Sequence, residues 1–138
     1  MDNSRVDEKK YPSLSVVIPV FNEEKTIEDV LKLVSYSNLV NEIVIVNDFS
    51  TDNSLGIMEK AIELILTGKP SLKIQLFNSD KNKGKGASLR KGFELANSEV
   101  IVIQDADLEY NPREYEKLIQ PIADGKADVV YGSRFIGG

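Results

Sequence analysis

Short runs rich in β-branched residues alternate along this chain with segments that have helical spacing. The runs are residues 14–20, 42–46, 73–77, 99–103 and 127–131. They are too continuous in apolar character to be half-exposed strands, which favours a sheet buried on both faces. Between them, apolar residues recur every three or four positions, a pattern typical of amphipathic helices. The four helical stripes are Ile27, Val30, Leu31 and Val34; Leu55, Met58, Ile62 and Ile65; Leu89, Phe93 and Ala96; and Tyr115, Leu118, Ile119 and Ile122.

Strands that alternate with helices form repeated βαβ units, whose connections are right-handed and whose strands are parallel. We therefore predict an α/β fold with a mostly parallel sheet between helices. The last helix has a start signal, with Asn111 as the cap, Pro112 at the first position and Glu114 reaching back to the cap.

Composition narrows the class of protein and the kind of site. The 138 residues suit one domain, which we place at 13–138 after a flexible arm of residues 1–12. A net charge of -5 argues against a nucleic-acid partner. The chain has no cysteine and no histidine, so any bound metal should be a hard cation held by oxygen.

The chain also lacks the features of a membrane-inserted or secreted segment. No apolar run approaches the roughly 20 residues that a membrane helix needs, and the polar N-terminus does not resemble a signal peptide. We expect a cytoplasmic protein, with a membrane-bound partner or substrate left open.

Polar residues follow each of the five predicted strands. Ligands of parallel α/β sheets bind beyond the carboxyl ends of the strands, so these five exits are expected to form one site. The exits are residues 19–24, 47–54, 78–88, 104–112 and 132–138.

The fourth exit carries two aspartates, Asp105 and Asp107, one residue apart. Side chains at i and i+2 of an extended segment point the same way, so both carboxylates can face one ligand. They repel each other unless a cation lies between them. Mg²⁺ or Mn²⁺, held by one or two carboxylates and by substrate phosphates, fits this pattern. The alternative is a solvated strand end with Asp107 in a turn, and the motif alone does not decide.

The second exit is dense in side-chain acceptors. Ser50, Asp52 and Asn53 are candidates to cap the following helix. Asp48, still at the tip of the strand, is not needed for capping and is suited to accept a hydrogen bond from a nucleobase or a ribose.

The third exit is basic and rich in glycine. Glycines and a helix start favour an anion, although the spacing matches neither a Walker loop nor a dinucleotide-binding loop. A basic mobile loop is the alternative for Lys81 and Lys83, whereas Lys85 and Arg90 are the better candidates for ligand binding.

The first and fifth exits are less specific. Pro19 stops the first strand, and we expect Asn22 to cap the next helix with Glu23 and Glu24 in its first turn. Arg134 in the fifth exit can bind phosphate or simply be a surface arginine.

Taken in order, the five exits resemble the family-2 glycosyltransferases, most closely the dolichyl-phosphate mannosyltransferase and polyprenyl-phosphate glycosyltransferase branch. The segments that carry the resemblance are VVIPVFNEEKTIEDVL, EIVIVNDFSTDNS, NKGKGASLRKGFELA, VIVIQDADLEYNP and DVVYGSRF, which together span about residues 14–136. The resemblance implies a Rossmann-like GT-A nucleotide-sugar-binding half. It also implies inverting, metal-dependent transfer from a UDP- or GDP-sugar to a polyprenyl phosphate or a growing glycan, in the synthesis of cell-envelope glycans.

The resemblance also suggests what individual residues do. Pro19, Phe21 and Glu23 would line the nucleoside pocket, and Asp48 would contact the base. Asp105 would contact the ribose or base, Asp107 would bind Mg²⁺ or Mn²⁺ with Asp105 nearby, and Arg134 would hold phosphate. Ala106, Lys85 and Arg90 complete the expected donor-binding set.

Two positions depart from the family pattern, with Asn47 in place of a first aspartate and Phe49 in place of a small glycine. Family members also continue beyond the Gly-Ser-Arg block into an acceptor-binding part and often into membrane helices. We therefore expect a donor-binding portion of a longer enzyme, without a catalytic base of its own. A phosphate acceptor, already anionic, needs no strong base.

Other classes fit less well. A haloacid-type phosphatase has its Asp-x-Asp after the first strand, a receiver domain has acidic residues there, and a sugar-nucleotide pyrophosphorylase has a glycine-rich loop there. The remaining alternative is a nucleotide-sugar-binding module without turnover.

Overall fold

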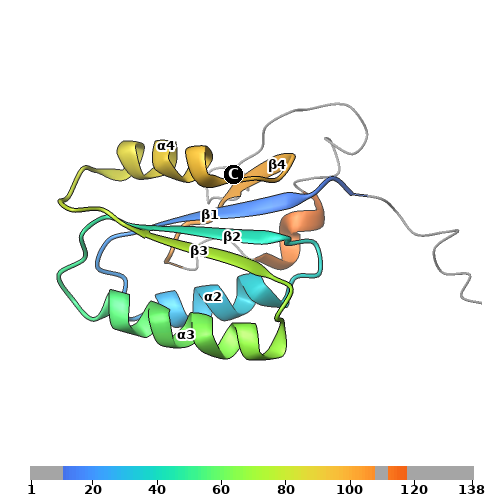
Figure 1. Ribbon diagram of the computed structural model, residues 1–138, viewed down its shortest axis with the longest axis horizontal. Helices are drawn as coiled ribbons and strands as arrows, with labels where there is room; N and C mark the ends of the chain where they lie inside the picture. The colour runs from blue at the N-terminus through green and yellow to red at the C-terminus, as the bar shows by residue number, and fades with distance from the viewer. Residues whose placement is uncertain (1–10, 108–111, 118–138) are drawn as a thin grey trace, which may run out of the picture.

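The computed structural model describes residues 11–107 and 112–117. Four strands form one parallel sheet in the order β3-β2-β1-β4 (Figure 1). The strands are β1 (Leu14–Val20), β2 (Glu42–Asn47), β3 (Lys73–Asn78) and β4 (Val100–Ile103). The predicted parallel α/β sheet is confirmed for these strands, while the predicted strand 127–131 lies outside the described residues.

Helices cover both faces of the sheet (Figure 1). They are α2 (Ile27–Tyr36), α3 (Ser54–Gly68) and α4 (Lys85–Leu95), followed by the short 3₁₀ helix η1 (Pro112–Glu114). Helices α2 and α3 lie side by side on one face, and α4 lies on the other. Pro112 does begin a helical turn as predicted, but its expected cap Asn111 lies outside the described residues.

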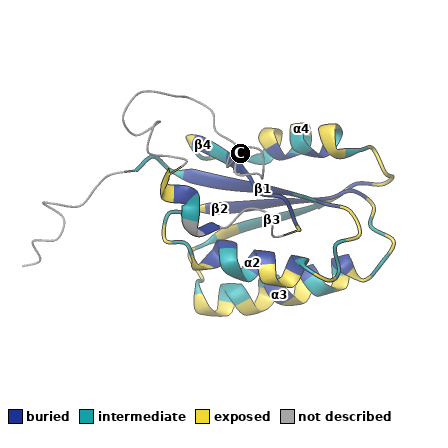
Figure 2. Ribbon diagram, turned by 180° about the vertical axis from the view of Figure 1, so that it is seen from behind, coloured by how far each residue is buried: buried dark blue, intermediate teal, exposed yellow. Residues whose placement is uncertain are grey.

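The core follows from the alternation of side chains along the two central strands. On β1, Val16 and Ile18 pack into the larger core beneath α2 and α3, whereas Val17 packs toward α4. On β2, Ile45 and Val44 divide between the two faces in the same way. Figure 2 shows β2 buried along its whole length and β1 buried except at Pro19, which is partly exposed. Each fully buried side chain of this size contributes about 1.5–3 kcal/mol, so these two strands anchor the loops that follow them.

Helix α4 lies unusually close to the sheet at Gly92. A Cβ built on Gly92 would lie 2.4 Å from Cγ1 of Val17. Real Cβ atoms do not approach that closely, so only glycine permits this distance between helix and strand. The contact sets the height of α4 above β1.

Two expectations about burial were wrong. Strand β3 is half-buried, not covered on both faces, because it lies at the edge of the sheet formed by the described strands. Phe93 does not join the core stripe of α4 and is 42% exposed, while Leu89 and Ala96 do pack against Val17 and its neighbours. In the described part of the chain, no helix combines the length and apolar character that a membrane crossing requires.

Candidate functional site

A cavity of about 210 Å³ opens beyond the carboxyl ends of β1, β2 and β4. Four of the five predicted exits contribute to it. Its lining residues are Pro19, Val20, Phe21, Glu23, Asp48, Lys85, Ser88, Asp105, Ala106 and Asp107. Parallel strands bring these residues together because all their carboxyl ends lie at one edge of the sheet.

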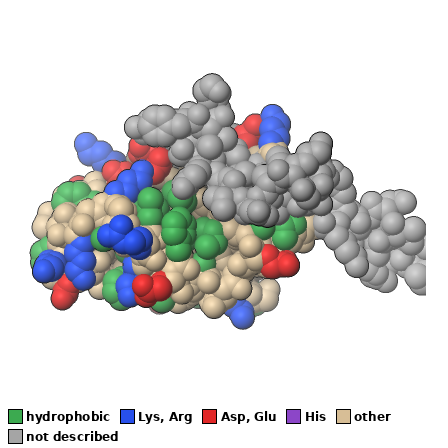
Figure 3. All heavy atoms as spheres, turned by 90° about the horizontal axis from the view of Figure 1, so that it is seen from above, with side chains coloured by type: hydrophobic (Ala, Val, Ile, Leu, Met, Phe, Trp, Pro, Cys, Tyr) green, Lys and Arg blue, Asp and Glu red, His purple; other side chains and the backbone are tan. Residues whose placement is uncertain are grey.

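Eight of the predicted donor-binding and metal residues line this cavity: Pro19, Phe21, Glu23, Asp48, Lys85, Asp105, Ala106 and Asp107. Arg90 does not. It is exposed on α4 and does not line the cavity. Figure 3, which views the molecule from above, shows several Lys and Arg side chains at the surface on that side. Arg134 lies outside the described residues. Both arginines therefore stay predictions.

The loops after β1 and β2 are joined by hydrogen bonds. Oδ1 of Asn22 accepts from the backbone N–H groups of Thr51 and Asp52 at 2.8 and 3.2 Å, and the Asn22 N–H donates to Oγ of Ser50 at 3.0 Å. The Glu23 N–H donates to Oγ of Ser54 at 2.9 Å. These hydrogen bonds between the two loops fix the wall of the cavity on which Glu23 lies.

The expected helix cap at Asn22 was wrong. Helix α2 begins at Ile27, and the Asn22 side chain instead accepts hydrogen bonds from the backbone of the loop after β2. Its backbone φ of 53° turns the chain toward that loop, a conformation that asparagine tolerates better than most residues. Of the candidate caps for α3, Asp52 does accept from the backbone N–H of Ser54, at 2.9 Å.

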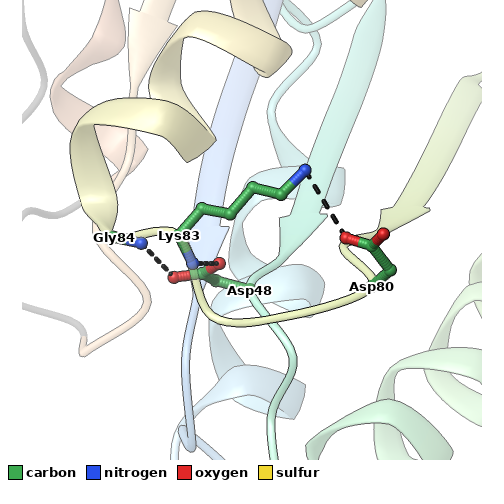
Figure 4. A network of polar contacts seen from close by, with 4 residues as sticks. All are labelled: Asp48, Asp80, Lys83 and Gly84. Carbon is green, nitrogen blue, oxygen red and sulfur yellow. Dashed lines mark hydrogen bonds and ion pairs between the residues drawn. The ribbon is translucent and has the colours of Figure 1, made fainter.

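Asp48 joins the second exit to the third. It is 4% exposed, and its two carboxylate oxygens accept from the backbone N–H groups of Lys83 and Gly84 at 2.8 and 2.9 Å (Figure 4). A carboxylate has about four acceptor positions, so this bonding leaves capacity for a ligand. Gly84, with a φ of 92°, then turns the chain into α4 at Lys85. Asp48 therefore sets where Lys85 enters the cavity.

The turn that carries the two aspartates is stabilised by hydrogen bonds to its backbone from outside the cavity lining. Oγ1 of Thr26 donates to the carbonyl of Ala106 at 2.5 Å. Gln104 is fully buried; its amide donates to the carbonyl of Asp105 at 3.2 Å and accepts from the hydroxyl of Tyr115 at 2.6 Å. Sequence reasoning missed these supports, although a glutamine beside the Asp-x-Asp motif in an otherwise apolar strand was a signal.

Ser88 was also missed. Its hydroxyl oxygen is buried and has no hydrogen-bond partner among the described residues. It lies one turn into α4, in the cavity wall beside Lys85. No polar pattern in the sequence sets it apart from an ordinary helical serine.

The cavity has a concentration of negative charge. Burial, and then repulsion from Asp107, Asp52 and Asp105, raise the pKa of Glu23 above its ordinary value. Against these carboxylates, Nζ of Lys85 lies 2.7 Å from Oδ1 of Asp105. Excess carboxylate charge in a cavity favours the binding of a cation.

The oxygen ligands fit a hard divalent cation that keeps other ligands of its own. Within residues 11–107 and 112–117, no group of three or more acidic side chains is arranged to hold a metal. Asp105 and Asp107 thus offer two carboxylates at the cavity. Mg²⁺ and Mn²⁺ suit such a set because they retain waters or phosphate oxygens.

Comparison with known proteins gives the site a family context. The family model for glycosyl transferase family 2 matches residues 15–138. A dolichol-phosphate mannosyltransferase of Pyrococcus furiosus is 34% identical over 91% of this chain and 34% of its own length. A UDP-N-acetylglucosamine–dolichyl-phosphate N-acetylglucosaminyltransferase of Methanococcus voltae is 33% identical over 86% of this chain and 51% of its own length.

A solved structure has the same fold. The mannosyltransferase PcManGT from Pyrobaculum calidifontis, in complex with GDP-Man and Mn²⁺, superposes with a TM-score of 0.64 at 28% identity over 71% of this chain and 28% of its own. The chain spans about a third to a half of the length of the two curated relatives. The sheet, the cavity at its carboxyl edge and the family match lead to one conclusion: the chain belongs to glycosyl transferase family 2 and has the GT-A fold.

Proposed function

We propose that this chain is the nucleotide-sugar-binding part of a metal-dependent, inverting glycosyltransferase that uses a UDP- or GDP-linked sugar. One observation carries the proposal: the cavity brings Glu23, Asp48, Asp105 and Asp107 together with Lys85. A nucleoside diphosphate needs hydrogen-bond acceptors for its base and ribose and positive charge for its phosphates. The cavity has the acceptors, and its carboxylates have room for the cation.

The residues divide this task by position. Pro19 and the half-exposed Phe21 offer an apolar surface for the nucleoside, and Asp48 accepts from its base. Asp105 accepts from the ribose or base and is the second carboxylate available to the metal. Asp107, exposed at the end of the turn, would hold Mg²⁺ or Mn²⁺. When bound, the metal supplies positive charge to the leaving diphosphate as the bond from the sugar to its phosphate oxygen breaks.

We further propose that the acceptor is a lipid-linked phosphate, met at the cytoplasmic face of a membrane. The curated relatives are named for transfer to dolichol phosphate, which supports this class of acceptor over a growing glycan. A phosphate oxygen is already anionic and attacks without a strong base, which agrees with a site whose carboxylates hold the donor.

A binding titration with UDP-glucose and GDP-mannose, each with and without Mn²⁺, tests the donor site. We expect Asp107→Ala to weaken metal-dependent nucleotide binding about 100-fold, a typical scale for loss of a metal ligand or its support. Asp80→Ala is the matched control, because Asp80 is exposed in the β3–α4 loop and pairs with Lys83 outside the cavity.

The outcomes separate the alternatives. Metal-dependent binding that Asp107→Ala abolishes and Asp80→Ala leaves intact supports the donor site. If the wild type binds no member of a wider nucleotide-sugar panel, the donor site is refuted. Tight binding with neither donor hydrolysis nor transfer to a polyprenyl phosphate supports a binding module without turnover.

A further inference from the structure

Lys85 is the one basic residue among those that line the described cavity, where the other charged lining residues are acidic. Its ammonium lies 2.7 Å from Oδ1 of Asp105. The two partners differ in exposure: the Lys85 side chain is 59% exposed and that of Asp105 only 9%. The carboxylate is therefore enclosed by its surroundings, whereas the lysine side chain has solvent beside it into which it can move.

The backbone directs Lys85 to this partner. Asp48 binds the N–H groups of Lys83 and Gly84, and the positive φ of Gly84 aims the first residue of α4 toward the exit of β4 (Figure 4). The neighbouring Lys83 points elsewhere, with its ammonium 3.5 Å from Oδ1 of Asp80. Lys83 and Lys85, separated by one residue, thus have different acidic partners, and of these two lysines only Lys85 lines the cavity.

We propose that Lys85 is an internal counter-ion of this site: it pairs with Asp105 when no nucleotide is bound, competes with the divalent cation for that carboxylate, and moves to the diphosphate when the metal–nucleotide complex enters. This inference rests on the proposed function. The ammonium is the exposed partner of the pair, so water can hydrate it when it leaves Asp105. Once displaced, the ammonium lies at the start of α4, where the helix dipole also favours an anion.

The consequence is coupling between metal and nucleotide. A metal that enters alone must displace Lys85 and leave its charge without a partner. A metal that enters with a diphosphate brings the new partner with it. Each ligand therefore raises the affinity for the other, as linkage requires.

Titration of Mn²⁺ into the nucleotide-free protein, followed by electron paramagnetic resonance of the free ion, tests the competition. We expect Lys85→Met to bind Mn²⁺ about fivefold more tightly than the wild type, the change that loss of one half-exposed ion pair allows. Lys83→Met removes the same charge from the same loop without touching Asp105, so it should stay within about twofold of the wild type.

The second measurement is binding of UDP and GDP at saturating Mn²⁺. Here Lys85→Met should bind the diphosphate about tenfold more weakly, the scale of one charge-assisted contact, and Lys85→Arg should recover most of the loss. A merely structural lysine would move both affinities in the same direction. Lys85→Gln repeats both measurements if the methionine variant does not fold.

Two results would refute the inference. Mn²⁺ affinity that is unchanged or weaker in folded Lys85→Met or Lys85→Gln rules out competition, and the proposed function then stands if the wild type still binds metal and nucleotide together. Unchanged diphosphate affinity in these two variants rules out the transfer of Lys85 to the phosphates. If instead the wild type binds no nucleotide diphosphate with Mn²⁺, the proposed function fails and this inference fails with it.

Discussion

The two ends of the parallel sheet both hold buried carboxylates, but they differ in how those carboxylates are bonded. At the amino end, Glu42 is 3% exposed and accepts four hydrogen bonds. The donors are the Ser15 hydroxyl, the Gln75 amide and both the backbone and side-chain N–H groups of Asn97, at 2.6–3.1 Å. At the carboxyl end, Asp48 accepts two backbone hydrogen bonds, and Asp105 pairs with Lys85, whose side chain is mostly exposed.

The pKa values follow the same division. Burial by itself raises the pKa of Glu42, but the hydrogen bonds from Ser15, Asn97 and Gln75 outweigh it and hold the pKa below the ordinary value. The pKa of Glu23 at the other end is raised by burial and by the neighbouring aspartates. A carboxylate with a full set of donors stabilises the fold. Carboxylates crowded together without such a set leave charge for a ligand to neutralise.

Strain is also confined to one end. Among the described residues other than glycine, Asn22 and Phe49 are the two with positive φ, at 53° and 59°, and both lie in loops beyond the carboxyl ends of strands. Helix α4 connects the two ends, because Asp48 binds the backbone at its start and Glu42 binds Asn97 just after its end. Four substitutions test the difference between the two ends of the sheet.

The largest effect is expected from Glu42→Gln. In the glutamine variant, a side-chain NH₂ group faces donors whose hydrogen bonds the Glu42 carboxylate accepts in the wild type. We therefore expect a loss of about 3 kcal/mol in the free energy of unfolding. Chemical denaturation at pH 7 measures it. Glu59→Gln on the exposed side of α3 is the control and should change stability little. Nucleotide binding by the folded variant should match the wild type; a loss below about 1 kcal/mol would mean that Glu42 is not a structural anchor.

The wild type and Glu42→Gln together test how the contribution of Glu42 to stability depends on pH. Because the folded-state pKa of Glu42 is lowered from 4.5, its stabilisation is present above that value. It should be lost as the pH falls below about 4.5 and through the lower folded-state pKa. Glu42→Gln should lack this component of acid destabilisation. Parallel stability curves for the two proteins below pH 4.5 would contradict the assignment.

Gly92→Ala should destabilise both ends at once, because the added Cβ collides with Val17 and lifts α4 from the sheet. We expect a loss of about 2 kcal/mol, typical of overpacking. Gly86→Ala is the matched control in the same helix, since its Cβ meets only the end of the Arg90 side chain at 3.8 Å. That variant should be as stable as the wild type or slightly more so, because alanine favours helix. Equal melting temperatures for the two variants would show that α4 is not seated as described.

Asp48→Asn should cost about 1.5 kcal/mol, because the amide has one acceptor atom for two N–H donors. Unlike Glu42→Gln, it should also weaken nucleotide binding, since the start of α4 and Lys85 lose their support. Denaturation and titration with UDP and GDP measure the two effects. Stability loss with unchanged binding would assign Asp48 to structure alone.

The smallest effect is a gain. Phe49 is 50% exposed and its φ of 59° is unfavourable for a bulky residue. Phe49→Gly should relieve this strain and stabilise the protein by about 0.5–1 kcal/mol, net of the entropy of glycine. Thermal denaturation beside Phe21→Gly, where φ is not positive, tests it. A loss of stability in Phe49→Gly would mean that contacts of the ring outweigh the backbone strain.

Much of the fold was predictable because its signals are local. The β-branched runs matched all four described strands to within one residue at each end, since apolar continuity depends only on the residues themselves. The carboxyl-edge site was predictable from topology, because parallel strands must end together. The predicted burial of Phe93 and of β3 was wrong because burial depends on which elements lie alongside, and helical or strand spacing carries no information about that.

Apolar spacing and the order of the strands are enough to predict the parallel α/β fold and the set of polar residues at its carboxyl edge. How those residues are bonded depends on the folded arrangement of the loops. Asn22 bonds to the loop after β2, Asp48 to the backbone at the start of α4, and Lys85 to Asp105. Arg90 lies away from the cavity. The reason is physical: hydrogen bonds and ion pairs depend on distances of about 3 Å between residues that lie tens of positions apart in the chain.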